Sequence, residues 1–228
     1  MRRVFAMLLC LPLLAAPAPQ RAKYVALTFD DGPSGRYTRR LLDGLSEREV
    51  PATFLLCGYR IREYPEETRR IFSEGHEIGC HGFSHRKMEG MSRRDIGAEI
   101  SDMLSLLPKG AQVSFLRPPG GCCNDAVRQV ATAKGLAILS WSVDPRDWAN
   151  HDRVSIEKNV LDKVADGDII LLHDMSDSSV DAALDIIDRL SERGFRFATV
   201  SQLAALRGYR INPGKDYSRF PWRVAASA

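Results

Sequence analysis

Two histidines and a pair of neighbouring aspartates are the residues whose types and spacing point most directly to chemistry. His81 and His85 are four positions apart, a spacing that places both rings on one side of a helical turn, where they can grip one metal ion. Asp30 and Asp31 are adjacent, so one carboxylate can complete a three-ligand metal face while the other handles protons. Each signal is weak alone, because such histidine pairs are often structural and Asp-Asp-Gly-Pro is often only a turn. Gly82 stands where a zinc metalloprotease has its glutamate, which argues against that class.

Other polar and aromatic residues follow apolar segments elsewhere in the chain. They are Arg117-Pro118-Pro119-Gly120-Gly121, then Trp141, Asp144, Asp147 and Trp148, and finally His173-Asp174.

Short apolar segments alternate with longer amphipathic ones and must position these residues. The apolar segments predict strands at 24–29, 52–56, 76–80, 113–116, 136–139, 168–172 and 195–200. The amphipathic segments predict helices at 37–49, 64–74, 92–107, 125–134, 154–165 and 180–193. This alternation predicts βαβ units, a parallel sheet and one α/β domain. Active sites assemble at the carboxyl ends of parallel strands. We therefore expect the polar and aromatic segments that follow these strands to form one site.

Composition limits the class of protein and its partners. The chain has 228 residues, of which 44% are hydrophobic and 27% charged, values that exclude a disordered chain, a coiled coil and a polytopic membrane protein. Basic residues number 32 against 29 acidic ones, and without Arg2 and Arg3 the counts are 30 and 29. A nearly neutral body predicts no nucleic-acid partner.

The first 22 residues predict a secretory signal peptide. Arg2 and Arg3 precede an apolar run over 4–16, and small residues and prolines follow, so we expect cleavage between about 16 and 22. An uncleaved anchor is the alternative. The mature chain is expected in the periplasm, cell envelope or extracellular space, as a monomer with no membrane contact beyond the signal segment.

Export makes the remaining cysteines candidates for disulfides. Cys57, Cys80, Cys122 and Cys123 allow three pairings, of which a bridge between the adjacent pair is disfavoured by disulfide geometry. One or two bridges and buried free thiols both remain open.

Five ordered motifs carry a family resemblance. They are Thr28-Phe29-Asp30-Asp31-Gly32-Pro33, His81 with His85, Arg117-Pro118-Pro119-Gly120, Asp144-Pro145-Arg146-Asp147-Trp148 and Leu171-Leu172-His173. Together they resemble the motifs of the NodB-homology polysaccharide deacetylases, carbohydrate esterase family four. The similarity implies a distorted (β/α)7 barrel over residues 23–207, with 208–228 as a C-terminal tail. It also implies divalent-metal-dependent removal of N-acetyl groups from amino-sugar polymers, with some relatives acting on O-acetyl xylan.

The resemblance implies roles for the matching residues. Asp31, His81 and His85 would bind the metal, expected to be Zn²⁺, with Co²⁺ or another divalent ion as alternatives. Asp30 would be the general base, and Arg117 would orient it.

The acid and the substrate contacts follow from the same resemblance. His173 would be the general acid, kept protonated by Asp144. The backbone near Gly120 would hold the oxyanion, and Trp148 and Leu171 would line a pocket for the acetyl methyl group.

The sequence therefore predicts a polysaccharide N-deacetylase, with an acetylated polysaccharide, most simply peptidoglycan, as substrate. Chitin or chitooligosaccharide N-deacetylation and acetyl-xylan O-deacetylation are the alternatives, and a silent carbohydrate-binding domain is the non-enzymatic one. The chain departs from the family pattern at three positions. Cys80 stands where the family usually has Asn, Gly82 where it has Ser or Thr, and Gly120 where it often has an aromatic residue. None of these departures removes a reacting group.

Overall fold

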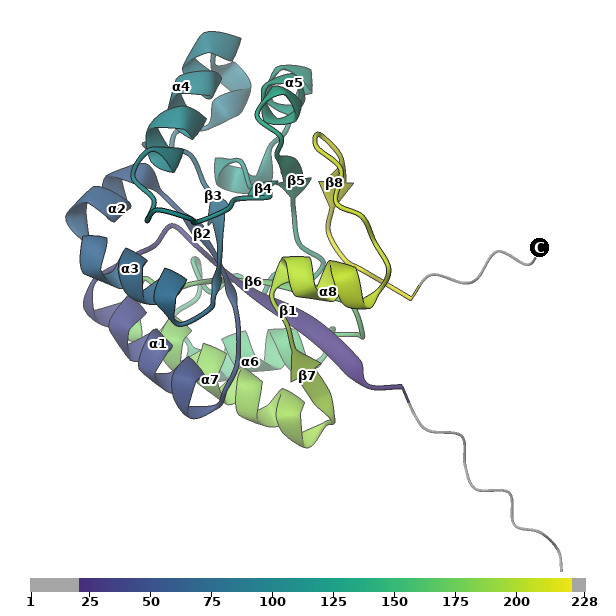
Figure 1. Cartoon of the computed structure of the whole chain (residues 1–228). Coiled ribbons are helices and arrows are strands. Elements are labelled where there is room, and N and C mark those ends of the chain that lie inside the picture. The colour runs from purple at the N-terminus through teal and green to yellow at the C-terminus, as the bar shows by residue number, and fades with distance from the viewer. Residues whose placement is uncertain (1–20, 223–228) are drawn as a thin grey trace, which may run out of the picture.

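A curled parallel sheet surrounded by helices forms the described part of the chain (Figure 1). The structure, a computed structural model, describes residues 21–222. The signal segment predicted over 1–22 therefore lies outside the described residues, apart from its last two. No helix within 21–222 has the length and apolar character needed to cross a membrane.

The strands pair in parallel throughout the sheet. Their bounds are β1 (Lys23–Asp30), β2 (Thr53–Leu56), β3 (Glu77–Cys80), β4 (Phe115–Leu116), β5 (Ala137–Leu139), β6 (Ile169–His173), β7 (Phe195–Phe197) and β8 (Asp216–Tyr217). The order is β6-β1-β2-β3-β4-β5-β8, and β7 pairs with β1 beside this path. Beyond β5, Val143 pairs with Ile170 of β6, which brings the two sides of the curl together. The prediction of a distorted barrel is confirmed.

Helices cover the outside of the curl. Their bounds are α1 (Arg36–Glu47), α2 (Gly58–Glu63), α3 (Pro65–Ser73), α4 (Arg93–Leu104), α5 (Asp125–Ala133), α6 (Arg153–Leu161), α7 (Asp177–Glu192) and α8 (Val200–Leu206). All six predicted helices are present. Helices α2 and α8 were not predicted, because helices of six and seven residues show too little periodicity. The strand predicted over 195–200 was too long, because Thr199 and Gln202 form a capping box that starts α8.

The opposite end of the barrel from the strand carboxyl ends is closed by α8. The Val200 N–H donates to Thr53 Oγ1 (3.0 Å) and the Ser201 N–H to Glu77 Oε2 (3.1 Å), and both acceptors belong to the first residues of strands. Leu203 and Ala204 of α8 join the apolar cluster of the barrel interior. The interior is therefore filled from this end, and a polar site can open only at the other.

The segment expected as a tail is partly built into the fold. Residues 216–217 form β8, which pairs with β5, and Phe220 is fully buried in the interior cluster. The cysteines of the described region are free thiols, with Cys57 and Cys80 buried and Cys122 exposed.

Candidate active site

Strand alternation directs four predicted site residues into the mouth of the barrel. The apolar cluster between the sheet and the surrounding helices is called the outer core. On β1, Leu27 and Phe29 belong to the outer core, and because successive side chains alternate along a strand, Asp30 faces the inside of the barrel. The same alternation turns His81, Arg117 and His173 inward, directly after β3, after β4 and at the end of β6. Their outward-facing neighbours, Cys80, Leu116 and Leu172, all belong to the outer core. The predicted convergence at the strand ends is confirmed.

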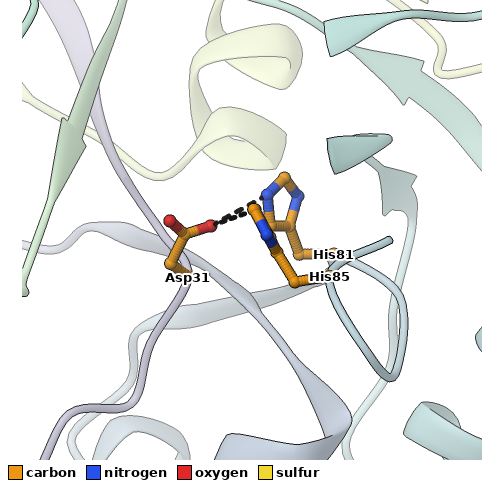
Figure 2. Close-up of side chains that lie close together, drawn as sticks. All are labelled: Asp31, His81 and His85. Carbon is orange, nitrogen blue, oxygen red and sulfur yellow. Dashed lines mark ion pairs between the residues drawn. The ribbon is translucent and has the colours of Figure 1, made fainter. Parts of the chain in front are cut away.

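Asp31, His81 and His85 lie together as a candidate metal site (Figure 2). Asp31 Oδ1 is 3.1 Å from His81 Nε2 and 2.9 Å from His85 Nε2, and one donor atom from each residue lies within 4.8 Å of the others. Asp31 Oδ1 is buried without a hydrogen-bond partner among residues 21–222. Two imidazole nitrogens and a carboxylate oxygen at such separations fit a divalent ion bound at about 2.0–2.2 Å.

The two histidines do not lie on a helical turn, so that interpretation of their spacing was wrong. They bracket a loop in which Gly82 has φ 79° and His85 φ 60°, and this left-handed backbone brings the rings together.

The turn after β1 fixes the Asp31 carboxylate. Asp31 itself has φ 71°. A Cβ on the next residue, Gly32, would lie only 2.6 Å from Asp174 Oδ1, so no side chain fits there. Asp174 accepts a hydrogen bond from the Thr38 hydroxyl, and the Thr38 oxygen accepts one from the Ser34 N–H. Burial would raise the pKa of Asp31, but His81 and His85 outweigh it and hold that pKa well below its usual range.

Arg117 fixes the second carboxylate. Its side chain has no exposed surface, and Nη1 donates to Asp30 Oδ1 at 2.6 Å and to Thr28 Oγ1 at 2.9 Å. Its remaining nitrogens donate to the carbonyl oxygens of Leu139 and Ser140. Asp30 Oδ2 lies 3.9 Å from His81 Nε2, so this carboxylate reaches the metal site with its other oxygen.

The partner of His173 is Asp147, and the prediction of Asp144 was wrong. His173 Nδ1 lies 2.9 Å from Asp147 Oδ1, and the His173 backbone N–H donates to Asp147 Oδ2 at 2.8 Å. Asp144 instead accepts a hydrogen bond from the Arg146 N–H at 2.7 Å, and within residues 21–222 no hydrogen bond or ion pair joins it to His173. Burial would lower the pKa of His173, but the hydrogen bond and charge of Asp147, with Asp30 and Asp31, raise it to about 9.

A pocket of about 470 Å³ joins these groups. Every predicted site residue except Arg117, which lies behind Asp30, lines it. Leu171 is 4% exposed and forms part of the pocket wall, whereas Trp148 is 55% exposed and lies at the pocket rim. The pocket also includes Lys87, Gly121 and Trp141, to which the sequence analysis gave no role. Trp141 follows a predicted strand and Asp147 belongs to the motif at 144–148, so the sequence could have indicated both as site residues. No motif or strand end indicates Lys87.

Comparison with known proteins establishes the family. A family model described as polysaccharide deacetylase matches residues 18–139, more than half of the chain. The chain belongs to the polysaccharide deacetylase family. The residues of this deacetylase described above therefore form its candidate active site.

Two relatives of this chain are peptidoglycan deacetylases. A peptidoglycan-N-acetylglucosamine deacetylase of Bacillus cereus is 39% identical over 191 residues, which cover 81% of the chain and 90% of that protein. The peptidoglycan-N-acetylmuramic acid deacetylase PdaC of Bacillus subtilis is 36% identical over 190 residues. The alignment covers 82% of the chain but only 40% of PdaC, which is a much longer protein.

A relative of known structure was solved with a bound metal ion and is named for a different substrate. The family 4 acetyl xylan esterase of Clostridium thermocellum, in complex with a cobalt ion, superposes with a TM-score of 0.81 at 35% identity. The superposition covers 87% of this deacetylase and all of that chain.

Proposed function

We propose that this protein is an exported, metal-dependent hydrolase that removes N-acetyl groups from peptidoglycan, releasing acetate and leaving a free amine on the sugar. One observation carries the proposal. Three metal donors, a carboxylate held by arginine and a histidine held by aspartate face the same pocket.

Asp31, His81 and His85 would hold the divalent ion, with Zn²⁺ as the expected metal because two imidazoles and a carboxylate are common zinc ligands. When bound, the ion polarises the acetyl carbonyl and makes the attacking water more acidic. Three protein ligands leave room for substrate and water, as a catalytic site requires.

Asp30 is the proposed general base. Arg117 holds Oδ1, which leaves Oδ2 on the side of the metal ligands to take the proton from the attacking water. Because Arg117 is buried with every nitrogen engaged, Asp30 keeps one orientation throughout the reaction.

His173 is the proposed general acid. Asp147 holds Nδ1, so Nε2 faces the pocket, where it lies 4.0 Å from Asp31 Oδ2. Asp147 raises the pKa of this imidazole, which favours a protonated ring that can deliver its proton to the amide nitrogen as the C–N bond breaks. An amine is a poor leaving group unless it is protonated, whereas an alkoxide depends less on protonation. A histidine that stays protonated therefore favours amide over ester substrates.

The remaining pocket residues are proposed to hold the acetylated sugar. Leu171 and Trp148 offer apolar surface to the acetyl methyl group. Gly120, with φ 74°, presents bare backbone beside the pocket, where a side chain would extend towards Lys87. Backbone N–H groups near Gly120 would stabilise the oxyanion.

Lys87 supports peptidoglycan over neutral polymers. Its side chain lines the pocket and forms no ion pair within residues 21–222. An ammonium group here can pair with the lactyl carboxylate of muramic acid, which alternates with glucosamine in peptidoglycan and is absent from chitin and xylan. The names of the Bacillus relatives point to the same polymer.

Acetate release by the full-length secreted protein tests the proposal. Peptidoglycan sacculi, N-acetylated chitooligosaccharides and acetyl-xylan would be compared with and without chelator, and the metal-loaded Asp30→Asn variant would be the control. The proposal predicts chelator-sensitive release that is fastest from sacculi and absent from the variant. Faster release from chitooligosaccharides or xylan would favour the alternatives, and no release from any polymer would favour a silent binding domain.

A further inference from the structure

The loop between the two metal-binding histidines adopts a backbone that it would not choose by itself. Gly82 has φ 79°, and His85 has φ 60° in a region that non-glycine residues rarely occupy. Such a conformation costs about 1 kcal/mol or more and persists only where surrounding contacts impose it. The contacts that impose it therefore help to decide where the His85 ring lies.

The two histidines are held by different means. His81 is buried, its N–H donates to Leu56 O at 2.9 Å, and its Nδ1 lies 2.6 Å from Arg117 O. The His85 side chain is 42% exposed, and within residues 21–222 its ring has no hydrogen-bond or ion-pair partner except Asp31. The strand and Arg117 fix the His81 ring, whereas the loop backbone must fix that of His85.

Two kinds of contact hold this loop. The Gly58 and Tyr59 N–H groups of α2 donate to Gly82 O at 3.0 Å and to Phe83 O at 2.9 Å. The loop's own N–H groups are held by one carboxylate from a neighbouring helix. Glu99 Oε2 accepts hydrogen bonds from the Phe83 N–H and the Ser84 N–H, each at 2.8 Å. Glu99 Oε1 accepts a third from the Ser84 hydroxyl at 2.6 Å. A Cβ at Gly82 would lie 3.3 Å from Glu99 Oε2 and 2.8 Å from Met88 Cε, so the loop fits closely over the carboxylate.

The helix that carries Glu99 is a rigid base for this contact. Ile96, Ile100 and Met103 of α4 are fully buried in the outer core. Ser92 caps the helix by accepting the Asp95 N–H. The carboxylate is thereby fixed relative to the sheet on which His81 and Asp31 are built.

We infer that Glu99 is a positioning residue for the metal site: by binding the backbone between His81 and His85, it sets the His85 ring at the distance needed for three-ligand binding. The inference rests on the proposed metal site and extends it to a residue that does not touch the ion. Partners of this kind usually change metal affinity by about tenfold to a hundredfold when they are removed.

Metal affinity, measured apart from catalysis, tests the role of Glu99. Co²⁺ would be titrated into the metal-free full-length protein and its visible absorption followed, for wild type, Glu99→Leu and Glu99→Ala. Leucine keeps much of the side-chain volume but has no acceptor oxygen for the Phe83 and Ser84 N–H groups, so it serves if the alanine variant fails to fold. Asp102→Asn, an exposed change on the same helix, is the matched control.

We expect the dissociation constant for Co²⁺ to rise at least tenfold in the Glu99 variants and to stay within twofold in Asp102→Asn. In a His85→Ala background, Glu99→Leu should cause little further loss, because the two changes act through one ring.

Two results would overturn the inference. The first is an unchanged dissociation constant in Glu99→Leu, with or without a lower melting temperature, since it would leave Glu99 a purely structural role. The second is full additivity with His85→Ala. Failure of the wild type itself to bind Co²⁺ would overturn the proposed metal site as well.

Discussion

Replacing Asp147 by asparagine should move the alkaline limb of the pH–rate profile to lower pH. Asp147 is fully buried, and its carboxylate contacts both Nδ1 and the backbone N–H of His173. The protonated imidazole is the form proposed to act, so activity depends on His173 keeping its proton. A raised pKa preserves that proton up to about pH 9, and loss of the partner carboxylate removes the main cause of the rise.

The size of the effect follows from the pKa of His173. In the wild type it is raised from 6.5 to about 9, which corresponds to about 3 kcal/mol in favour of the charged ring. Without Asp147, burial still lowers the pKa of His173 and only Asp30 and Asp31 raise it, so the pKa should fall towards its ordinary value of 6.5. At pH 7.5 the protonated fraction would fall from roughly 97% to about 10%, a tenfold loss of rate. At pH 6 the two enzymes should differ much less.

The assay is acetate release over pH 5.5–10 with the metal-loaded variants at saturating substrate. Metal content, measured on the same samples, should not change, because Asp147 is not among the proposed ligands. Asp144→Asn is the control, since Asp144 bonds the Arg146 N–H and does not touch His173. The pairing would be refuted if the limb stayed in place in Asp147→Asn, or if it moved equally in Asp144→Asn.

Three further changes test the ligand set, the substrate preference and the barrel packing. His81→Ala should abolish stoichiometric metal binding, and metal retained at one ion per chain would contradict the ligand assignment. Lys87→Gln should raise KM for peptidoglycan about two- to fivefold, as expected for an exposed ion pair, and leave KM for chitooligosaccharides unchanged. An equal change for both substrates would exclude a role in recognising a carboxylate. Gly79→Ala would place a Cβ 2.3 Å from Leu55 Cδ1 in the barrel and should destabilise the fold by about 1–3 kcal/mol. Gly90→Ala, with nothing within 4 Å, is its control, and equal melting temperatures for the two variants would contradict the reasoning.

Much of the fold could be predicted because its signals are local. Apolar residues recur with the period of the buried face, so a strand or helix can be recognised from its own residues. The apolar run over 24–29 predicts a strand in this way, and the spacing of Ile96, Ile100 and Met103 predicts a helix. Three short elements, α2, α8 and β8, were not predicted. Two residues of β8 pair with β5 only because the chain returns to that edge, which no local pattern can announce.

The sequence by itself determined which groups could react and that they would meet. Asp30, His81 and His173 each follow or end an apolar strand, and parallel strands bring their carboxyl ends to one edge.

Only the tertiary structure decided which carboxylate serves which partner. Asp144 and Asp147 stand three positions apart in one motif, and the sequence analysis chose the wrong one as the partner of His173. The Glu99 carboxylate binds a loop that lies at least 15 positions away in the sequence, and no motif around Glu99 indicates this contact. Hydrogen bonds act over about 3 Å, and such distances are set by the packing of whole helices and strands, which sequence spacing does not record.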